Sequence, residues 1–253
     1  MIAPQRVLPA AVLMVASLVS AGAVAEEPLV FGNPDYFCRN GAFPGGGDYP
    51  GELPAFKPAR ITGQPGERIH FLKDWDFSRT SYDPGHCPDV DDPQCLDKPY
   101  LIPGDTVIVS KTLRGFACAW YQPKRGHETV GWLPLSKVAM REPEAHPGAD
   151  AWAGVWKSGD DTLVLQSGDR GALRVLGRAY WPGRNAPPFH TGFVEGIAIP
   201  EHNTLNVEYP PGTGEARCRL RLSLVGPLLI ASDNHLCGGV NVAFDGVYVR
   251  QRK

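Results

Sequence analysis

Apolar residues in this chain recur at alternate positions, in short runs separated by turn-forming residues. In "CRLRLSLV" (218–225) the leucines lie on one face of an extended segment and the arginines on the other. Shorter runs such as "TVIVSKT" (106–112), "FACAWYQ" (116–122) and "TVGWLPL" (129–135) are rich in β-branched and aromatic residues. No amphipathic helix of ordinary length is evident. The pattern therefore predicts an all-β protein built from antiparallel barrels, with at most short helical turns.

Changes in composition along the chain divide it into segments. Residues 26–68 are rich in Pro and Gly and predict an extended arm, and their aromatic residues argue against full disorder. Strand patterns then fill 69–140, which predicts a small first barrel. The Pro-, Gly- and charge-rich stretch 141–151 predicts a linker, and 152–253 predicts a second antiparallel barrel.

The first 25 residues have the features of a signal peptide. A single basic residue, Arg6, precedes a long apolar run that ends in Ala23-Val24-Ala25. A membrane anchor is the alternative, but small residues dominate the end of the run and no basic cluster follows it. We expect cleavage near residue 25 and a periplasmic or secreted protein with no stable membrane span. The formal net charge of −2, without clustered basic residues, does not favour nucleic-acid binding.

All six cysteines follow the expected cleavage site. An even number in an exported chain predicts three disulfides, and the absence of C-x-x-C argues against a metal site. Six cysteines allow fifteen pairings. Sequence proximity and the flanking strand patterns favour Cys218–Cys237, and we assign the remaining pairs as Cys87–Cys95 and Cys38–Cys118.

The segment 100–138 resembles the bacterial SH3-like (SH3b) domain. The matching elements are Gly104-Asp105 before the strand 106–109, Gly115-Phe116 entering "CAWYQ", and 129–133 followed by 135–138. An Asp- and Cys-rich loop at 83–99 departs from the pattern. The resemblance implies a small barrel that binds peptide or cell-wall material in an aromatic groove.

Candidate groove residues follow from this resemblance. They are Tyr100, Trp120, Tyr121 and Trp132. The alternative is that these aromatics fill the core of the small barrel. Strand alternation places Trp120 and Tyr121 on opposite faces, so at most one of the two belongs to that core.

The second domain opens with "GVW" and ends with arginine, which resembles the calycin pattern of lipocalins. The resemblance implies that Arg250 or Arg252 lies across Trp156 next to Gly154, in a structural role. The short length is nearer to compact calycin-like barrels found among periplasmic inhibitors of proteases and lysozymes. Separately, the Cys-Gly-Gly turn at 237–239 predicts unusual backbone angles or close backbone approach.

No constellation for catalysis is evident. The seven histidines are scattered, and neither H-E-x-x-H nor G-x-S-x-G occurs. A calcium site in "DVDDPQCLD" would use Asp89, Asp91, Asp92 and Asp97, but the glycine and glutamate of an EF-hand loop are absent. We expect no enzyme activity, no cofactor and no metal.

Two functions remain after these exclusions. The first is an exported protein that recognises peptidoglycan or a peptide, with a cell-envelope protein as a possible partner. The second is a periplasmic inhibitor or immunity protein that acts against a lysozyme or another cell-wall hydrolase. A hydrolase, the third hypothesis, has no supporting residues.

Overall fold

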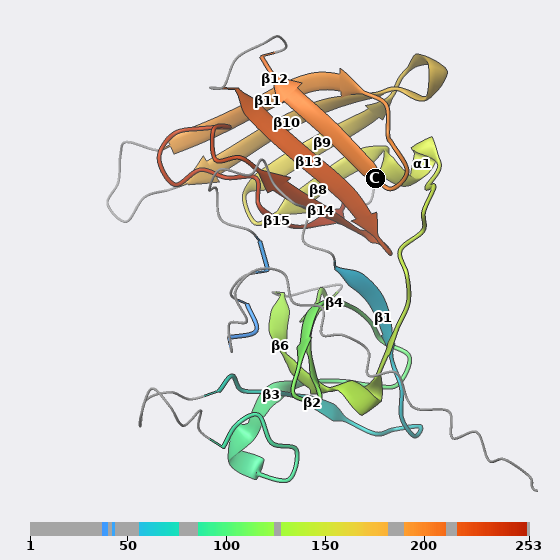
Figure 1. The fold of residues 1–253 in the computed structure, drawn as a ribbon, viewed down its shortest axis with the longest axis vertical. Helices are drawn as coiled ribbons and strands as arrows, with labels where there is room; N and C mark the ends of the chain where they lie inside the picture. The colour runs from blue at the N-terminus through green and yellow to red at the C-terminus, as the bar shows by residue number, and fades with distance from the viewer. Residues whose placement is uncertain are drawn as a thin grey trace, which may run out of the picture.

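Two antiparallel β domains lie one above the other in the computed structural model (Figure 1). The structure describes residues 37–39, 42–43, 56–75, 86–123, 128–181, 190–210 and 217–251. The expected signal peptide, most of the arm and Arg252 lie outside the described residues. The all-β class is confirmed.

The first domain contains a seven-stranded sheet with the order β3-β2-β6-β5-β4-β1-β7. Single-turn 3₁₀ helices precede β3 and β7, at Pro93–Cys95 and Leu135–Lys137. The strands are β1 (Lys57–Ile61), β2 (Ile69–Leu72), β3 (Leu96–Leu101), β4 (Thr106–Leu113), β5 (Phe116–Tyr121), β6 (Thr129–Pro134) and β7 (Val138–Met140).

Strand β1 corrects the expected boundary between the arm and the first domain. It lies within the 26–68 segment but pairs with both β4 and β7. The Pro-rich composition concealed this strand because proline normally interrupts a sheet ladder. Here Pro58 lies just beyond the end of β7, and its carbonyl accepts a hydrogen bond from the N–H of Arg141 at 2.8 Å. Among the described residues, the strands of the first domain therefore begin at Lys57 instead of residue 69.

An eight-stranded sheet forms the second domain, in the order β11-β10-β9-β8-β15-β14-β13-β12. It curls into a nearly closed barrel whose edge strands β11 and β12 lie side by side. At this seam a Cβ on Gly196 would lie 2.6 Å from Cγ1 of Val207, so β11 approaches β12 closely. Its elements are α1 (Ala149–Trp152), β8 (Gly154–Ser158), β9 (Asp161–Ser167), a 3₁₀ turn (Asp169–Gly171), β10 (Leu173–Trp181), β11 (His190–Ala198), β12 (Thr204–Tyr209), β13 (Cys218–Val225), β14 (Leu228–Asp233) and β15 (Gly246–Arg250).

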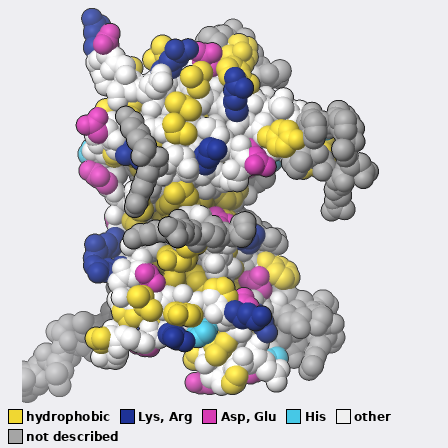
Figure 2. Space-filling model, turned by 180° about the vertical axis from the view of Figure 1, so that it is seen from behind, with side chains coloured by type: hydrophobic (Ala, Val, Ile, Leu, Met, Phe, Trp, Pro, Cys, Tyr) yellow, Lys and Arg dark blue, Asp and Glu magenta, His cyan; other side chains and the backbone are white. Residues whose placement is uncertain are grey.

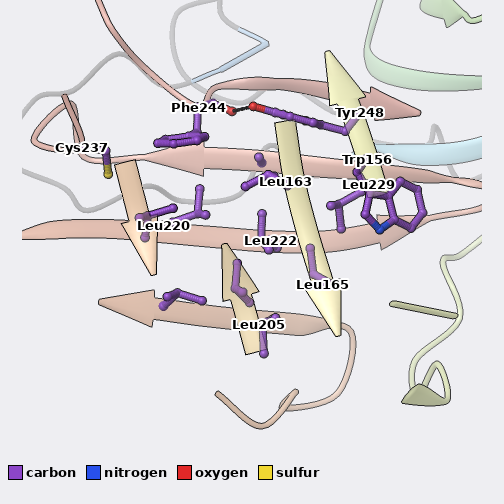
Figure 3. Packing of buried hydrophobic residues seen from close by; sticks show 14 of the residues in the cluster. Trp156, Leu163, Leu165, Leu205, Leu220, Leu222, Leu229, Cys237, Phe244 and Tyr248 are labelled. Atoms are coloured by element: carbon purple, nitrogen blue, oxygen red, sulfur yellow. Dashed lines mark hydrogen bonds between the residues drawn. The ribbon is translucent and has the colours of Figure 1, made fainter. Parts of the chain in front are cut away.

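The barrel interior is filled by side chains. The alternating leucines of β13 point inward, as the sequence predicted, and meet residues from the other strands (Figure 3). Tyr248 is fully buried among them and its hydroxyl donates to the carbonyl of Phe244 at 3.1 Å. The short helix α1, at the end of the expected linker, adds the buried Trp152 to this core. The interior is thus a packed core of the kind found in small barrels.

A second hydrophobic core joins the two domains. Outward-facing residues of the barrel (Val225, Leu228, Ile230 and Val247) cluster with aromatic and aliphatic residues of the first domain. The first domain contributes Cys38, Ala42, Phe56, Leu72, Trp75, Ile108, Cys118, Trp120 and Trp132. Hydrophobic side chains are visible at the waist between the domains (Figure 2). Because these residues are buried, we treat the two domains as one packed unit.

The structure contains three disulfides, and their pairing is the one expected from the sequence: Cys38–Cys118, Cys87–Cys95 and Cys218–Cys237. Disulfides of this kind fit an oxidising compartment such as the periplasm or the extracellular space. Within the described ranges, no helix has the length and apolar character needed to cross a bilayer.

Candidate functional site

The proposed aromatic groove of the first domain is closed. Trp132 is 0% exposed and Trp120 is 4% exposed, so neither offers a surface on which a ligand could stack. The indole N–H of Trp132 donates to Asp74 Oδ1 at 2.7 Å, and that of Trp120 donates to Ser110 Oγ at 3.0 Å. The rings of Phe43 and Phe56 lie against Trp120, and the ring of Trp75 lies against Trp132, within the cluster that the second domain completes. The structure therefore contradicts the prediction that these two tryptophans line an exposed groove.

The two tyrosines have different environments. Tyr121 is partly buried and packs against a separate core inside the first domain, which includes Phe71 and Leu133. It therefore lies on the opposite face from Trp120, as alternation predicted. Tyr100 on β3 is exposed, and the guanidinium carbon of Arg68 lies 4.7 Å from the centre of its ring. On the neighbouring strand β2, the ring of His70 lies 5.5 Å from the ring of Tyr100. Of the four predicted residues, Tyr100 is the exposed aromatic.

The predicted contact between Trp156 and Arg250 is present. The Arg250 guanidinium lies 4.9 Å from the centre of the Trp156 ring and donates to the carbonyls of Asp150 and Ala151. A Cβ on Gly154 would be 3.1 Å from Arg250 Nε, and φ at Gly154 is +152°. These contacts join the last strand of the barrel to Trp156 on β8 and to α1.

The acidic loop considered for calcium has a local structural role. Asp89 Oδ1 accepts from the N–H of Asp91, and Asp92 Oδ1 accepts from the N–H of Gln94, both at 2.8 Å. Asp92 also lies 3.1 Å from His86 Nε2. These hydrogen bonds stabilise turns next to the Cys87–Cys95 disulfide.

The most elaborate polar arrangement lies at the loop 234–245, between β14 and β15. Asp233, at the end of β14, accepts from the N–H of His235 on Oδ1 and from that of Phe244 on Oδ2. Asp245, at the other end of the loop, accepts from the N–H of Asp233 at 2.7 Å. Its second oxygen is 3.0 Å from His235 Nε2. Hydrogen bonds therefore join the two ends of the loop.

Contacts with neighbouring strands hold the middle of this loop. Cys237 is bonded to Cys218 on β13, and its carbonyl accepts from the N–H of Phe193 on β11 at 3.0 Å. A Cβ on Gly238 would be 2.8 Å from the Cα of Gly192, so the two backbones touch. This is the close approach that the Cys-Gly-Gly turn predicted. His190 adds a hydrogen bond from Nδ1 to the carbonyl of Val240, at 2.5 Å.

The outer surface of the loop is apolar and exposed. Leu236 is 50% exposed and Val240 is 69% exposed, although the loop backbone is held on both sides. A surface hollow of about 420 Å³ lies beside them, lined by His235 and the residues 238–243. Val242 and Phe244 point the other way and enter the barrel core. The contacts with the barrel thus fix the inner side of the loop, and its outer side presents two aliphatic side chains to solvent.

Two carboxyl groups, those of Asp233 and Asp245, lie at the base of the loop. Burial raises the pKa of Asp233, and the nearby carboxylate of Asp245 adds to this effect, while hydrogen bonds from two backbone N–H groups oppose it. Burial also raises the pKa of Tyr248 well above its usual range, and the charges of Asp161, Asp233 and Asp245 contribute. Among the described residues, the structure records no ion pair between a lysine or arginine and either Asp233 or Asp245.

This loop was not identified as a site from the sequence. Asp, His and Asn before a Gly-Gly pair are typical turn residues, and Asp245 is ten residues from His235. The available indication was the cysteine inside the loop, since a disulfide there fixes an otherwise exposed turn.

The fold and the loop together define an all-β protein with two packed domains and a fixed, exposed loop on its barrel. Comparison with known proteins adds no family: no family model, no curated protein and no solved structure matches this chain.

Proposed function

We propose that this chain is a non-enzymatic exported protein that binds another protein through the loop 234–245, as an inhibitor or immunity protein against a lysozyme or other cell-wall hydrolase. The observation that supports this proposal is the loop itself. Leu236 and Val240 are exposed on a backbone that a disulfide and several hydrogen bonds hold in place.

A fixed loop of this kind suits tight binding of a folded partner. Binding costs conformational entropy when a loop must be ordered, and a loop ordered beforehand avoids most of that cost. Exposed aliphatic side chains beside a hollow provide the apolar centre of an interface, and His235 and Asn241 supply polar contacts around it. Exclusion of water from Leu236 and Val240 would then contribute most of the affinity.

The experiment measures inhibition of lysozymes of several classes and of peptidoglycan amidases by the purified chain, in a turbidity assay with cell walls. Leu236→Asp and Val240→Asp are each expected to weaken inhibition by about 30-fold or more, as for an interface hot spot of about 2 kcal/mol. Ile197→Asp is the control, because Ile197 is 75% exposed on β11 outside the loop. Absence of inhibition across the panel, or equal inhibition by all variants, would contradict the proposal.

A second candidate is recognition of cell-wall material at Tyr100, which the SH3b resemblance implies. It is favoured by the exposed Tyr100 ring with Arg68 stacked over it. Sedimentation with insoluble peptidoglycan tests it directly: the wild-type chain would pellet, and Tyr100→Ala would stay in the supernatant. A wild-type chain that stays entirely in the supernatant would remove this candidate.

A further inference from the structure

We propose that Asp233, His235 and Asp245 form a binding site for a divalent transition-metal ion such as Zn²⁺. One carboxylate oxygen from each aspartate and one ring nitrogen of the histidine all lie within 4.8 Å of one another. His235 Nε2 and Asp245 Oδ2 are 3.0 Å apart. In a tetrahedral zinc site with bonds of about 2.0 Å, ligand atoms are roughly 3.3 Å apart, so the ligand atoms here would have to approach one another by at most about 1.5 Å.

The carboxylates keep the capacity to bind an ion. Each oxygen of Asp233 accepts one backbone N–H, and a carboxylate oxygen has a second lone pair. Asp245 accepts a backbone N–H on Oδ1, which leaves Oδ2 directed to the histidine. The hydrogen bonds therefore orient both carboxylates, as the groups that surround a metal ligand usually do.

Charge favours a cation at this position. Two carboxylates lie close together at the base of the loop, and no lysine or arginine of the described segments forms an ion pair with them. Asp233 is only 1% exposed, so its negative charge is weakly solvated. A divalent ion would neutralise both carboxylates in a place where water cannot fully do so.

The site is open to solvent on one side. The side chain of His235 is 41% exposed and lines the 420 Å³ hollow. Three protein ligands with one open side leave room for water to complete the coordination, and nitrogen with oxygen ligands suits Zn²⁺, Co²⁺ or Mn²⁺. A second cluster within the described residues, His86 with Cys87 and Cys95, is excluded because both cysteines are in a disulfide.

An ion at this position would fasten the two ends of the loop, since Asp233 precedes it and Asp245 follows it. The inference concerns the metal alone and does not depend on the proposed inhibitor function. The two can fail separately, because metal binding is measured without any partner protein.

The test is titration of the purified, chelator-treated chain with Co²⁺, followed by its visible absorption, and then displacement by Zn²⁺. We expect one Co²⁺ per chain and a rise in Tm on addition of Zn²⁺. His235→Asn is expected to abolish stoichiometric binding and the rise in Tm. Asparagine is chosen because φ at residue 235 is +55°, which asparagine tolerates.

Two further variants define the position of the ion. Asp245→Asn should also abolish stoichiometric binding, with circular dichroism confirming the fold. His202→Asn is the control, because the ring of His202 lies 5.0 Å from that of His146, outside the proposed site, and its φ of +55° also suits asparagine. Absence of binding to the wild-type chain would overturn the proposal, and so would binding that survives His235→Asn but is lost in His202→Asn.

Discussion

Replacement of Ile230 by alanine tests whether the two domains form one folded unit. Ile230 is on the outer face of β14, where a residue of an isolated barrel would contact solvent, yet it is 0% exposed in the core shared by the domains. The substitution removes three carbons, which costs about 2.4 kcal/mol in transfer free energy. The cavity left behind adds to this, and core Ile→Ala changes typically cost about 2–5 kcal/mol. We therefore expect a loss of about 3 kcal/mol in the free energy of unfolding.

The assay is urea unfolding followed by tryptophan fluorescence and by circular dichroism. Ile197→Ala is the matched control, because Ile197 lies on an outer face of the same barrel but is 75% exposed, and its change should stay within about 0.5 kcal/mol. The wild-type chain should unfold in one transition by both probes.

Equal stabilities for the two variants would refute the reasoning. In that case the outer face of β14 would be free of the first domain in solution. The aromatic cluster around Trp120 and Trp132 would then be held by its contacts with Phe43, Phe56 and Trp75 alone.

Three further changes test other parts of the structure. Gly154→Ala should destabilise the chain by about 1–3 kcal/mol, measured by urea unfolding, because φ is +152° and the new Cβ would crowd Arg250; a neutral result would contradict the packing described at that end of the barrel. Replacement of Cys218 and Cys237 together by serine should lower the free energy of unfolding by about 2–4 kcal/mol and make the loop 234–245 sensitive to proteases. Unchanged digestion would show that the hydrogen bonds alone fix the loop. Asp161→Asn should stabilise the chain near neutral pH, because burial raises the pKa of Asp161 in the folded state. Just above the usual pKa of aspartate, the folded state then binds more protons than the unfolded state, so the stability of the wild-type chain falls as pH rises through that range. A pH series of melting curves should show a smaller fall in Tm for the variant than for the wild-type chain.

The strands could be predicted from the sequence because alternation reports which residues face a core. It identified the inward leucines of β13, and the resemblance to the calycin pattern implied the contact between Trp156 and Arg250. The arrangement of the domains was not foreseen. An indication was present in β14, whose residues 228–231 are apolar at every position, which is typical of a strand covered on both faces.

The candidate site was missed for a different reason. Asp233, His235 and Asp245 are separated in sequence, and each is ordinary for a turn. They meet only because β14 and β15 are neighbours in the barrel, so that the two ends of the loop return to the same place. Alternation and composition carry no information about such a meeting, since it depends on which strands pair.

Burial of the aromatic face also determines how binding experiments on this chain should be interpreted. The first domain expressed alone would expose the part of the shared core that packs with Val225, Leu228, Ile230 and Val247 of the barrel. Exposed apolar patches of this size bind many surfaces and promote aggregation. Retention of the isolated domain on peptidoglycan would therefore say nothing about the full chain, in which the barrel covers that face. Binding that belongs to the native protein has to be measured on a chain that contains both domains, and it should respond to changes at Leu236, Val240 or Tyr100, which are exposed there.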